Sequence, residues 1–265
     1  MKKPKVCILR TAGTNCDKET AFAFSRAGAD VDLAHVNSFI RKERSLRDYK
    51  ILAFPGGFSY GDDIAAGKIL ANEMRCKLAD ELRSFVREGK LIIGICNGFQ
   101  ILVKAGLLPG NDALEQDASL IINDSGKFED RWVYLKNSKF KIKNSKCVWT
   151  KDLPEVIYLP VAHGEGKFIT QDRPMLQGLK KKGQIVFQYC DKEGKFGGYP
   201  VNPNGSSEHI AGICDATGRV LGLMPHPERH LQSQQHPRWG VSGNKTEGDG
   251  MQIFINGVNY AKKHL

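Results

Sequence analysis

Short apolar runs in the first hundred residues constrain the fold of this chain more than any other feature. The runs are KVCILR, VDLAHV, ILAF and LIIGI, at residues 5–10, 31–36, 51–54 and 91–95. Helical patterns separate them at residues 17–28 and over about 64–88, and a further helix follows Gly98. Short buried strands that alternate with helices predict a parallel sheet covered on both faces. In such a sheet, sites form in the loops beyond the carboxyl ends of the strands.

The second half of the chain is richer in strand patterns. These occupy residues 119–124, 131–136, 156–170 and 184–190, and residues 210–228 read as a hairpin that turns at 216–219. We expect a long polar loop over 232–248 and a closing helix over 249–263. Without an internal repeat or a clean linker, the sequence predicts one α/β domain over residues 1–265, with a mostly parallel central sheet and extra strands in the C-terminal half.

Composition excludes several classes of protein. No apolar run approaches the roughly 18 residues of a membrane span, and the basic opening MKKPKVCILR lacks the long apolar segment of a signal peptide. The seven cysteines form no CxxC pair, so we expect neither a disulfide framework nor a zinc ribbon. The interpretation is a cytoplasmic protein with reduced thiols, no membrane association and no metal site.

The formal net charge of +10 is concentrated locally, at Lys136, Lys139, Lys141, Lys143 and Lys146 and again at residues 180–182. A solvated face or a surface that docks a partner is the favoured interpretation, because charge runs are usually solvated. Nucleic-acid binding is the alternative, but Phe140 is the single aromatic residue in the first segment, the second has none, and neither carries an RNA-binding signature.

The stretch GICNGFQ places Cys96 between Gly94 and Gly98, where a strand pattern gives way to a helix pattern. A sharp strand-to-helix turn brings the residues on either side of its apex into contact, so both must be small. The N-terminus of the helix favours negative charge, and the Asn97 amide can form half of an oxyanion hole. Cys96 is therefore a candidate nucleophile; the alternative is a buried cysteine at a tight turn.

A cysteine nucleophile needs a base, and the base needs a group that orients it. MPHPE supplies both, because Pro227 disfavours the α conformation at His226, and residues i and i+2 of an extended chain project to the same side. Glu228 can therefore hold the ring of His226 while the other ring nitrogen faces Cys96.

Two further glycine-rich stretches are weaker indications of a site. In PGGFSYGD, Gly56 and Gly57 allow close backbone approach and can supply a second oxyanion donor. In VAHGEGK, His163 is either a core histidine or part of backbone exposed to a ligand. The sequence has no G-x-x-x-x-G-K-[ST] loop and no G-x-G-x-x-G in its first βαβ unit, so nucleotide chemistry is expected on another chain.

Taken in order, these motifs resemble those of class I (triad) glutamine amidotransferases over nearly the whole chain. GICNGFQ and PHPE are shared in outline across that family, whereas TNCDKET, GGFSYGDD and HGEGK resemble its glutaminase subunits of purine biosynthesis. The resemblance implies a flavodoxin-like three-layer fold. The chain is longer than compact members, with extra residues expected around 137–155 and 232–248.

The resemblance also implies roles for individual residues. Cys96, His226 and Glu228 would form the triad. The backbone amides of Gly57 and Asn97 would form the oxyanion hole. Gln100 would help to hold the side chain of the substrate glutamine. The backbone at Gly164 and Glu165 would bind the amino acid end of the substrate.

The implied reaction is hydrolysis of glutamine through a glutamyl thioester. Ammonia would pass to an ATP-dependent synthetase subunit that amidates formylglycinamide ribonucleotide, with ATP and Mg²⁺ on that partner, no cofactor on this chain, and a small accessory subunit. We expect low activity without the partner, through an unformed oxyanion hole near Gly57 or Asn97. Alternatives are the glutaminase partner of a different synthetase and a non-catalytic thiol-sensing protein of flavodoxin-like fold.

Overall fold

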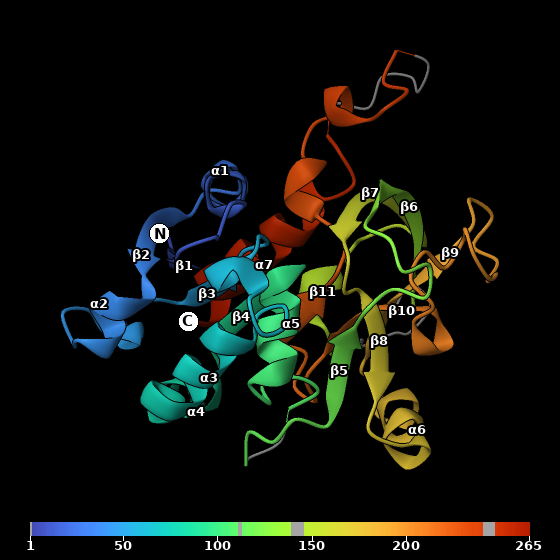
Figure 1. Ribbon diagram of the computed structural model, residues 1–265. Helices are drawn as coiled ribbons and strands as arrows, with labels where there is room; N and C mark the ends of the chain where they lie inside the picture. The colour runs from blue at the N-terminus through green and yellow to red at the C-terminus, as the bar shows by residue number, and fades with distance from the viewer. Residues whose placement is uncertain (1, 111–112, 139–145, 241–246) are drawn as a thin grey trace.

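The fold is built on a nine-stranded sheet in the strand order β2-β1-β3-β4-β11-β10-β9-β6-β7 (Figure 1). The computed structural model describes residues 2–110, 113–138, 146–240 and 247–265. The strands of the first half are β1 (Lys5–Arg10), β2 (Asp30–His35), β3 (Ile51–Phe54) and β4 (Leu91–Ile95). They pair in parallel with one another, and β11 (Val220–Leu223) continues the parallel part beside β4.

The second half of the chain adds antiparallel strands to this sheet. They are β6 (Glu129–Asn137), β7 (Val156–His163), β9 (Ile185–Cys190) and β10 (Ile210–Cys214). A separate two-stranded sheet joins β5 (Ala118–Ile121) to β8 (Lys167–Thr170). The predicted α/β architecture, with extra strands in the C-terminal half, is confirmed.

Helices cover both faces of the sheet, which makes three layers. On one face α1 (Asp17–Arg26) packs against α7 (Met251–His264), where the Phe24 and Phe254 rings meet edge to face at 5.0 Å. On the other lie α3 (Lys68–Lys77), α4 (Ala79–Arg87) and α5 (Asn97–Lys104) (Figure 1). The remaining helices are α2 (Val36–Ile40) and α6 (Arg173–Lys181).

One cluster of buried apolar side chains extends through the described parts of both halves, from Val6 in β1 to Ala261 in α7. The strands β3 and β4 are buried along their whole length, as expected for a sheet covered on both faces. No helix in the described ranges is both long and apolar enough to cross a membrane.

Three predictions about the helices and strands are wrong. The single helix expected over about 64–88 is two helices, because Gly67 adopts a left-handed conformation (φ +71°) before α3 and Leu78 leaves helical geometry (φ −130°) before α4. The break lets α3 bury Met74 while α4 buries Phe85. The strand pattern over 156–170 is β7 and β8 with a turn between them, and α2 follows β2 where no helix was expected.

The two segments expected to be longer than in compact relatives are only partly described, since residues 139–145 and 241–246 lie outside the described ranges. Lys139, Lys141 and Lys143 of the basic run fall among them. The described part of the first segment is anchored, because Trp149 is buried and its carbonyl oxygen accepts a hydrogen bond from Asn256 of α7.

The close approach of α5 to β3 gives a test of the fold. A methyl group at Gly98 would lie 1.9 Å from the Phe54 carbonyl oxygen, so strand β3 would have to move. We expect Gly98→Ala to lower the free energy of unfolding by at least about 1–3 kcal/mol, measured by urea denaturation. Gly178→Ala in α6 is the control, because no heavy atom lies within 4 Å of its added methyl group and alanine favours the helix. Equal effects of the two substitutions would contradict this account.

Candidate active site

The predicted site residues follow neighbouring strands at one edge of the sheet. Cys96 follows β4, His226 follows β11 and Gly57 follows β3. These strands are adjacent and parallel, so their carboxyl ends open onto the same edge.

Cys96 stands at the apex of the turn from β4 to α5. Its backbone has φ 52° and ψ −107°, an unfavourable conformation for a residue with a side chain. A methyl group at Gly94 would lie 2.6 Å from the Gly98 carbonyl oxygen across the turn, and one at Gly98 would lie 1.9 Å from the Phe54 carbonyl oxygen of β3. The Cys96 thiol is 3.6 Å from the carbonyl oxygen of Ala162, to which it donates. The structure therefore has the strained turn that the spacing predicts.

His226 and Glu228 form a buried pair. Nδ1 of His226 lies 2.7 Å from Oε1 of Glu228, and the side chains are only 2% and 0% exposed. Burial opposes protonation of the ring, but the negative charge of Glu228, followed by the electrostatic interaction with Cys96, outweighs this effect and raises the pKa of His226 well above its ordinary value.

The pair lies beside the nucleophile candidate, across Gly56. A methyl group at Gly56 would come within 2.8 Å of Cε1 of His226 and 3.4 Å of Cβ of Cys96. The absence of a side chain at Gly56 thus leaves room for the ring and the thiol on the same side of the turn.

The two predicted oxyanion donors are Gly57, in the loop after β3, and Asn97, at the start of α5. Gly57 has φ +140°, and a methyl group there would be 2.7 Å from Asn15 N, so only glycine fits. Asn97 is the first residue of α5, where opening amides have no partner within the helix.

The Asn97 side chain fixes the loop after β3. Its Oδ1 accepts hydrogen bonds from the backbone and hydroxyl of Ser59, at 3.2 and 2.6 Å, and its Nδ2 donates to Asp62. Burial raises the pKa of Asp62. Ser59 and Asp62 belong to the GGFSYGDD motif, which explains why that motif and GICNGFQ occur together.

Gln100, Gly164 and Glu165, the predicted glutamine-binding residues, also come together. Nε2 of Gln100 donates to the backbone oxygen of Glu165 at 2.6 Å, and its Oε1 accepts from Asn97 at 3.0 Å. The amide of Gln100 therefore holds the turn between β7 and β8 against α5. The Glu165 carboxylate lies 3.8 Å from Lys104 Nζ, also on α5.

Asn123 was not predicted as a site residue, but it organises the same turn. Its amide group donates to His163 O, and its Oδ1 accepts from the backbone of Gly166 at 2.9 Å. Its backbone N–H donates to Gly164 O at 2.9 Å. The sequence offers little sign of this role, because Asn123 is distant from the turn along the chain.

His163 is a buried histidine close to the proposed base. Burial, and next the charge of His226, lower the pKa of His163 to about 4. Nδ1 of His163 pairs with Asn123 at 3.1 Å. Of the two interpretations of His163, the core histidine fits its 3% exposure.

Cys16 and Arg229 are two further neighbours that the sequence reasoning missed. Cys16 follows β1, and Nη2 of Arg229 donates to its sulfur at 3.2 Å, while Nε of Arg229 lies 3.3 Å from Glu19. The Cys16 sulfur would be 3.2 Å from a methyl group at Gly56. Cys16 belongs to TNCDKET, so the motif was noticed, although no role was assigned to the residue.

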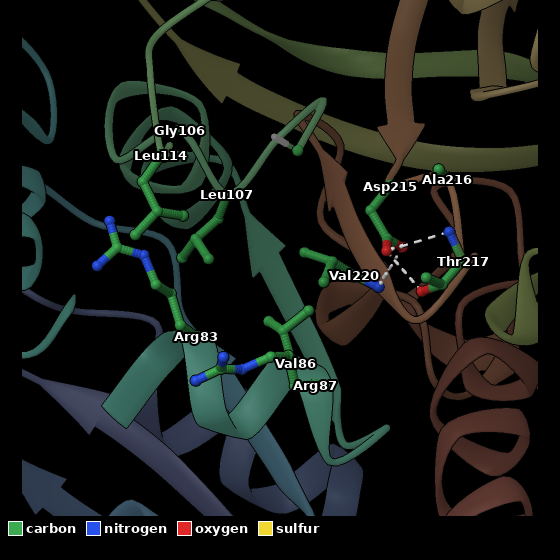
Figure 2. Close-up of a pocket in the computed structure, with 11 residues that line it drawn as sticks. Arg83, Val86, Arg87, Gly106, Leu107, Leu114, Asp215, Ala216, Thr217 and Val220 are labelled. Carbon is green, nitrogen blue, oxygen red and sulfur yellow. Dashed lines mark hydrogen bonds between the residues drawn. The ribbon is translucent and has the colours of Figure 1, made fainter. Parts of the chain in front are cut away.

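A cavity of about 430 Å³ lies at the opposite edge of the sheet (Figure 2). Arg87, Leu107 and Val220 line it, and Val220 begins the strand that ends near His226. The cavity is therefore separate from the triad residues.

The motifs, fold and geometry agree with the comparisons to known proteins. A model of the CobB/CobQ-like glutamine amidotransferase domain matches residues 3–261, so the chain belongs to this family of glutamine amidotransferases.

Within the family the chain is of the PurQ type. It is 49% identical over 264 residues to the phosphoribosylformylglycinamidine synthase subunit PurQ of Dehalococcoides mccartyi, covering 99% of this chain and 100% of the relative. The PurQ of Methanococcus maripaludis is 45% identical over 274 residues, covering 98% of each.

Solved structures confirm the fold. A chain from a structure described as PurLQS from Thermotoga maritima superposes with a TM-score of 0.73 at 32% identity, covering 98% of this chain and 99% of that one. A glutamine amidotransferase from Thermotoga maritima has a TM-score of 0.51 at 16% identity, covering 99% of this chain and 94% of that one, and shares the fold.

The lowered pKa of His163 predicts a pH dependence of stability. The unfolded chain takes up this proton below about pH 6.5 and the folded chain only near pH 4, so stability present above pH 6.5 is lost as the pH falls toward 4. His163→Gln lacks this titration, so between pH 7 and pH 4 the wild type is expected to lose on the order of 3 kcal/mol more than the variant. Urea unfolding at the two pH values measures the difference. Parallel losses in the two proteins would show that His163 titrates normally.

Proposed function

We propose that this chain is the glutaminase subunit of a phosphoribosylformylglycinamidine synthase. The observation that carries the proposal is the buried His226–Glu228 pair beside Cys96 on its strained turn. The PurQ relatives, which the chain matches over its whole length, support the choice of synthetase.

The proposed mechanism follows from these groups. Cys96 gives its thiol proton to His226 and attacks the side-chain amide of glutamine, and the Gly57 and Asn97 amides stabilise the oxyanion. His226, oriented by Glu228, protonates the departing ammonia and then activates the water that hydrolyses the glutamyl thioester. The raised pKa of His226 favours the imidazolium that must donate this proton.

The ammonia is consumed on a second subunit. We propose an ATP-dependent synthetase that carries ATP and Mg²⁺ and amidates formylglycinamide ribonucleotide, together with a small accessory subunit, in the cytoplasm. The PurLQS structure supports such a partner, since its matching chain is 32% identical to this one.

Exposed aromatic rings mark where the synthetase would bind. Phe58, which directly follows Gly57, is 46% exposed, and Phe128 is 53% exposed. Their rings stack with centroids 6.4 Å apart, and a methyl group at Gly164 would be 3.8 Å from Phe128. Exposed apolar groups at the rim of a site are typical of a protein interface. A partner there would contact the loop that carries Gly57, which gives a route to the predicted activation.

Glutamine hydrolysis by the complex with the synthetase subunit tests the triad. Cys96→Ala is expected to lower the rate by at least about 10³-fold, because no other group supplies the nucleophile, while synthesis from added ammonia continues. Cys76→Ala, at an exposed thiol, is the control with an unchanged rate.

His226→Ala separates the triad from thiol sensing. It is expected to abolish hydrolysis as well, whereas an oxidisable thiol needs no such base. Full hydrolysis by either triad variant, or no turnover by the wild type with its synthetase, would refute the proposed function. Turnover with only a different synthetase would refute the assigned partner.

Charged substitutions test the proposed interface. Phe58→Asp and Phe128→Asp are expected to weaken association with the synthetase by about tenfold or more, since buried aromatic side chains often dominate binding. Analytical ultracentrifugation measures the association. Phe22→Asp, at a 54% exposed ring on α1, is the matched control. The surface is wrongly assigned if all three variants bind as the wild type does.

A further inference from the structure

The turn between β7 and β8 is held in place by side chains from distant parts of the chain. It contains Gly164 and Glu165, whose backbone is expected to bind the amino acid end of glutamine. Asn123 donates to the carbonyl oxygen of His163, and Gln100 to that of Glu165. A third set of contacts comes from the loop between β9 and β10, which the sequence reasoning did not connect with the site.

Asn204 lies in that loop, and its side chain is completely buried. Its Nδ2 donates to the carbonyl oxygen of Gly166 at 2.8 Å and to the hydroxyl of Tyr189 at 3.2 Å. Its Oδ1 accepts from the backbone N–H and the hydroxyl of Ser206, at 3.1 and 2.8 Å. Both donors and both acceptor positions of this amide group are therefore used, which fixes the orientation of the side chain.

Ser206 and Asn123 complete the contacts around Gly166. The hydroxyl of Ser206 accepts from the backbone N–H of Phe168 in β8 at 2.9 Å, so the loop also holds the strand that follows the turn. Oδ1 of Asn123 accepts from the backbone N–H of Gly166 at 2.9 Å. Both backbone polar groups of Gly166 are thus bound by buried side chains, the N–H by Asn123 and the carbonyl group by Asn204.

The position of the turn matters because the nucleophile lies beside it. The carbonyl oxygen of Ala162, at the end of β7, is 3.6 Å from the Cys96 thiol. A methyl group at Gly166 would lie 2.3 Å from Cε1 of His163, so the turn packs directly on that buried ring. A shift of the turn would change the distance between the thiol and the backbone groups expected to hold the substrate.

We infer that Asn204 is a positioning residue for glutamine, because its bond to Gly166 sets where the backbone of Gly164 and Glu165 meets the amino acid end of the substrate. The inference rests on the proposed function, which assigns that end to these two residues. Asn204 acts through Gly166 and takes no part in the bond changes at Cys96. Loss of its contact therefore weakens substrate binding in the ground state and the transition state alike, which raises KM and leaves kcat nearly unchanged.

Asn204→Asp tests the inference in the complex with the synthetase. The substitution keeps the size of the side chain but places an oxygen where Nδ2 donates to Gly166, so a buried carbonyl group loses its partner. We expect the KM for glutamine to rise by at least about tenfold, while kcat changes by less than about threefold. Initial rates of glutamate formation over a range of glutamine concentrations measure both constants.

Asn256→Asp is the matched control. Asn256 in α7 is also buried, and its Nδ2 donates to the carbonyl oxygens of Trp149 and Lys151, at 2.9 and 2.6 Å. This variant is expected to unfold at a lower urea concentration than the wild type but to keep the wild-type KM. If it raised KM as much as Asn204→Asp does, the effect would be one of general stability and the positioning role would be refuted.

Ser206→Ala provides a second variant in case Asn204→Asp does not fold, which circular dichroism would reveal. It removes the hydroxyl that binds Oδ1 of Asn204 and the N–H of Phe168. We expect a rise in KM of at least about threefold, since hydrogen bonds that orient Asn204 and β8 are lost. An unchanged KM in either folded variant would overturn the inference.

Glutamine binding without turnover separates this inference from the proposed function. The complex of Cys96→Ala with the synthetase is expected to bind radiolabelled glutamine in equilibrium dialysis. Adding Asn204→Asp should weaken that binding by at least about tenfold. Equal binding by the single and the double variant would refute the positioning role alone, whereas a wild-type complex that does not hydrolyse glutamine would refute the proposed function itself.

Discussion

The parallel pairing of β4 with β11 is the interaction on which the rest of the site depends. Gly94 lies opposite Gly222 in this pairing, and the Cys96 amide donates to the carbonyl oxygen of Leu223 at 2.8 Å. The two strands are far apart in sequence, yet the nucleophile candidate leaves one and the histidine leaves the other. A one-residue change of register would turn alternate side chains to the opposite face and move His226 relative to Cys96.

Glycines make this pairing compatible with α5. A methyl group at Gly222 would lie 2.1 Å from the Phe99 ring, and one at Gly98 would meet the Phe54 carbonyl oxygen. The helix can therefore lie close against both strands only because side chains are missing there. The strained Cys96 backbone is retained because packing and the hydrogen bonds of Asn97 hold α5 on one side and the β3 loop on the other.

Local patterns predicted the parts of the molecule that local physics determines. The pairing of His226 with Glu228 was predicted from an extended chain; the pair is present, but Pro227–Arg229 form a 3₁₀ turn instead of extended chain. The glycines around Cys96 were enough to predict the turn. The insertion of β11 between β4 and β10 was not predictable, because it depends on contacts between distant strands. For the same reason Asn123 and Cys16 were not assigned roles. The break at Leu78 was missed because both helices continue the same apolar periodicity.

The polar side chains around Cys96 explain why the chain alone is expected to be a poor catalyst. Asn97 and Gln100 bond to each other, and Gln100 also bonds to Glu165 O, so these groups are satisfied within the protein. A glutamine substrate has to exchange one of these bonds or rely on backbone groups at Gly57 and Gly164. Both glycines lie next to the exposed Phe58 and Phe128 pair. A partner that covers the two rings can therefore change the backbone that the substrate needs without disturbing the His226–Glu228 pair, which is buried and anchored to β11.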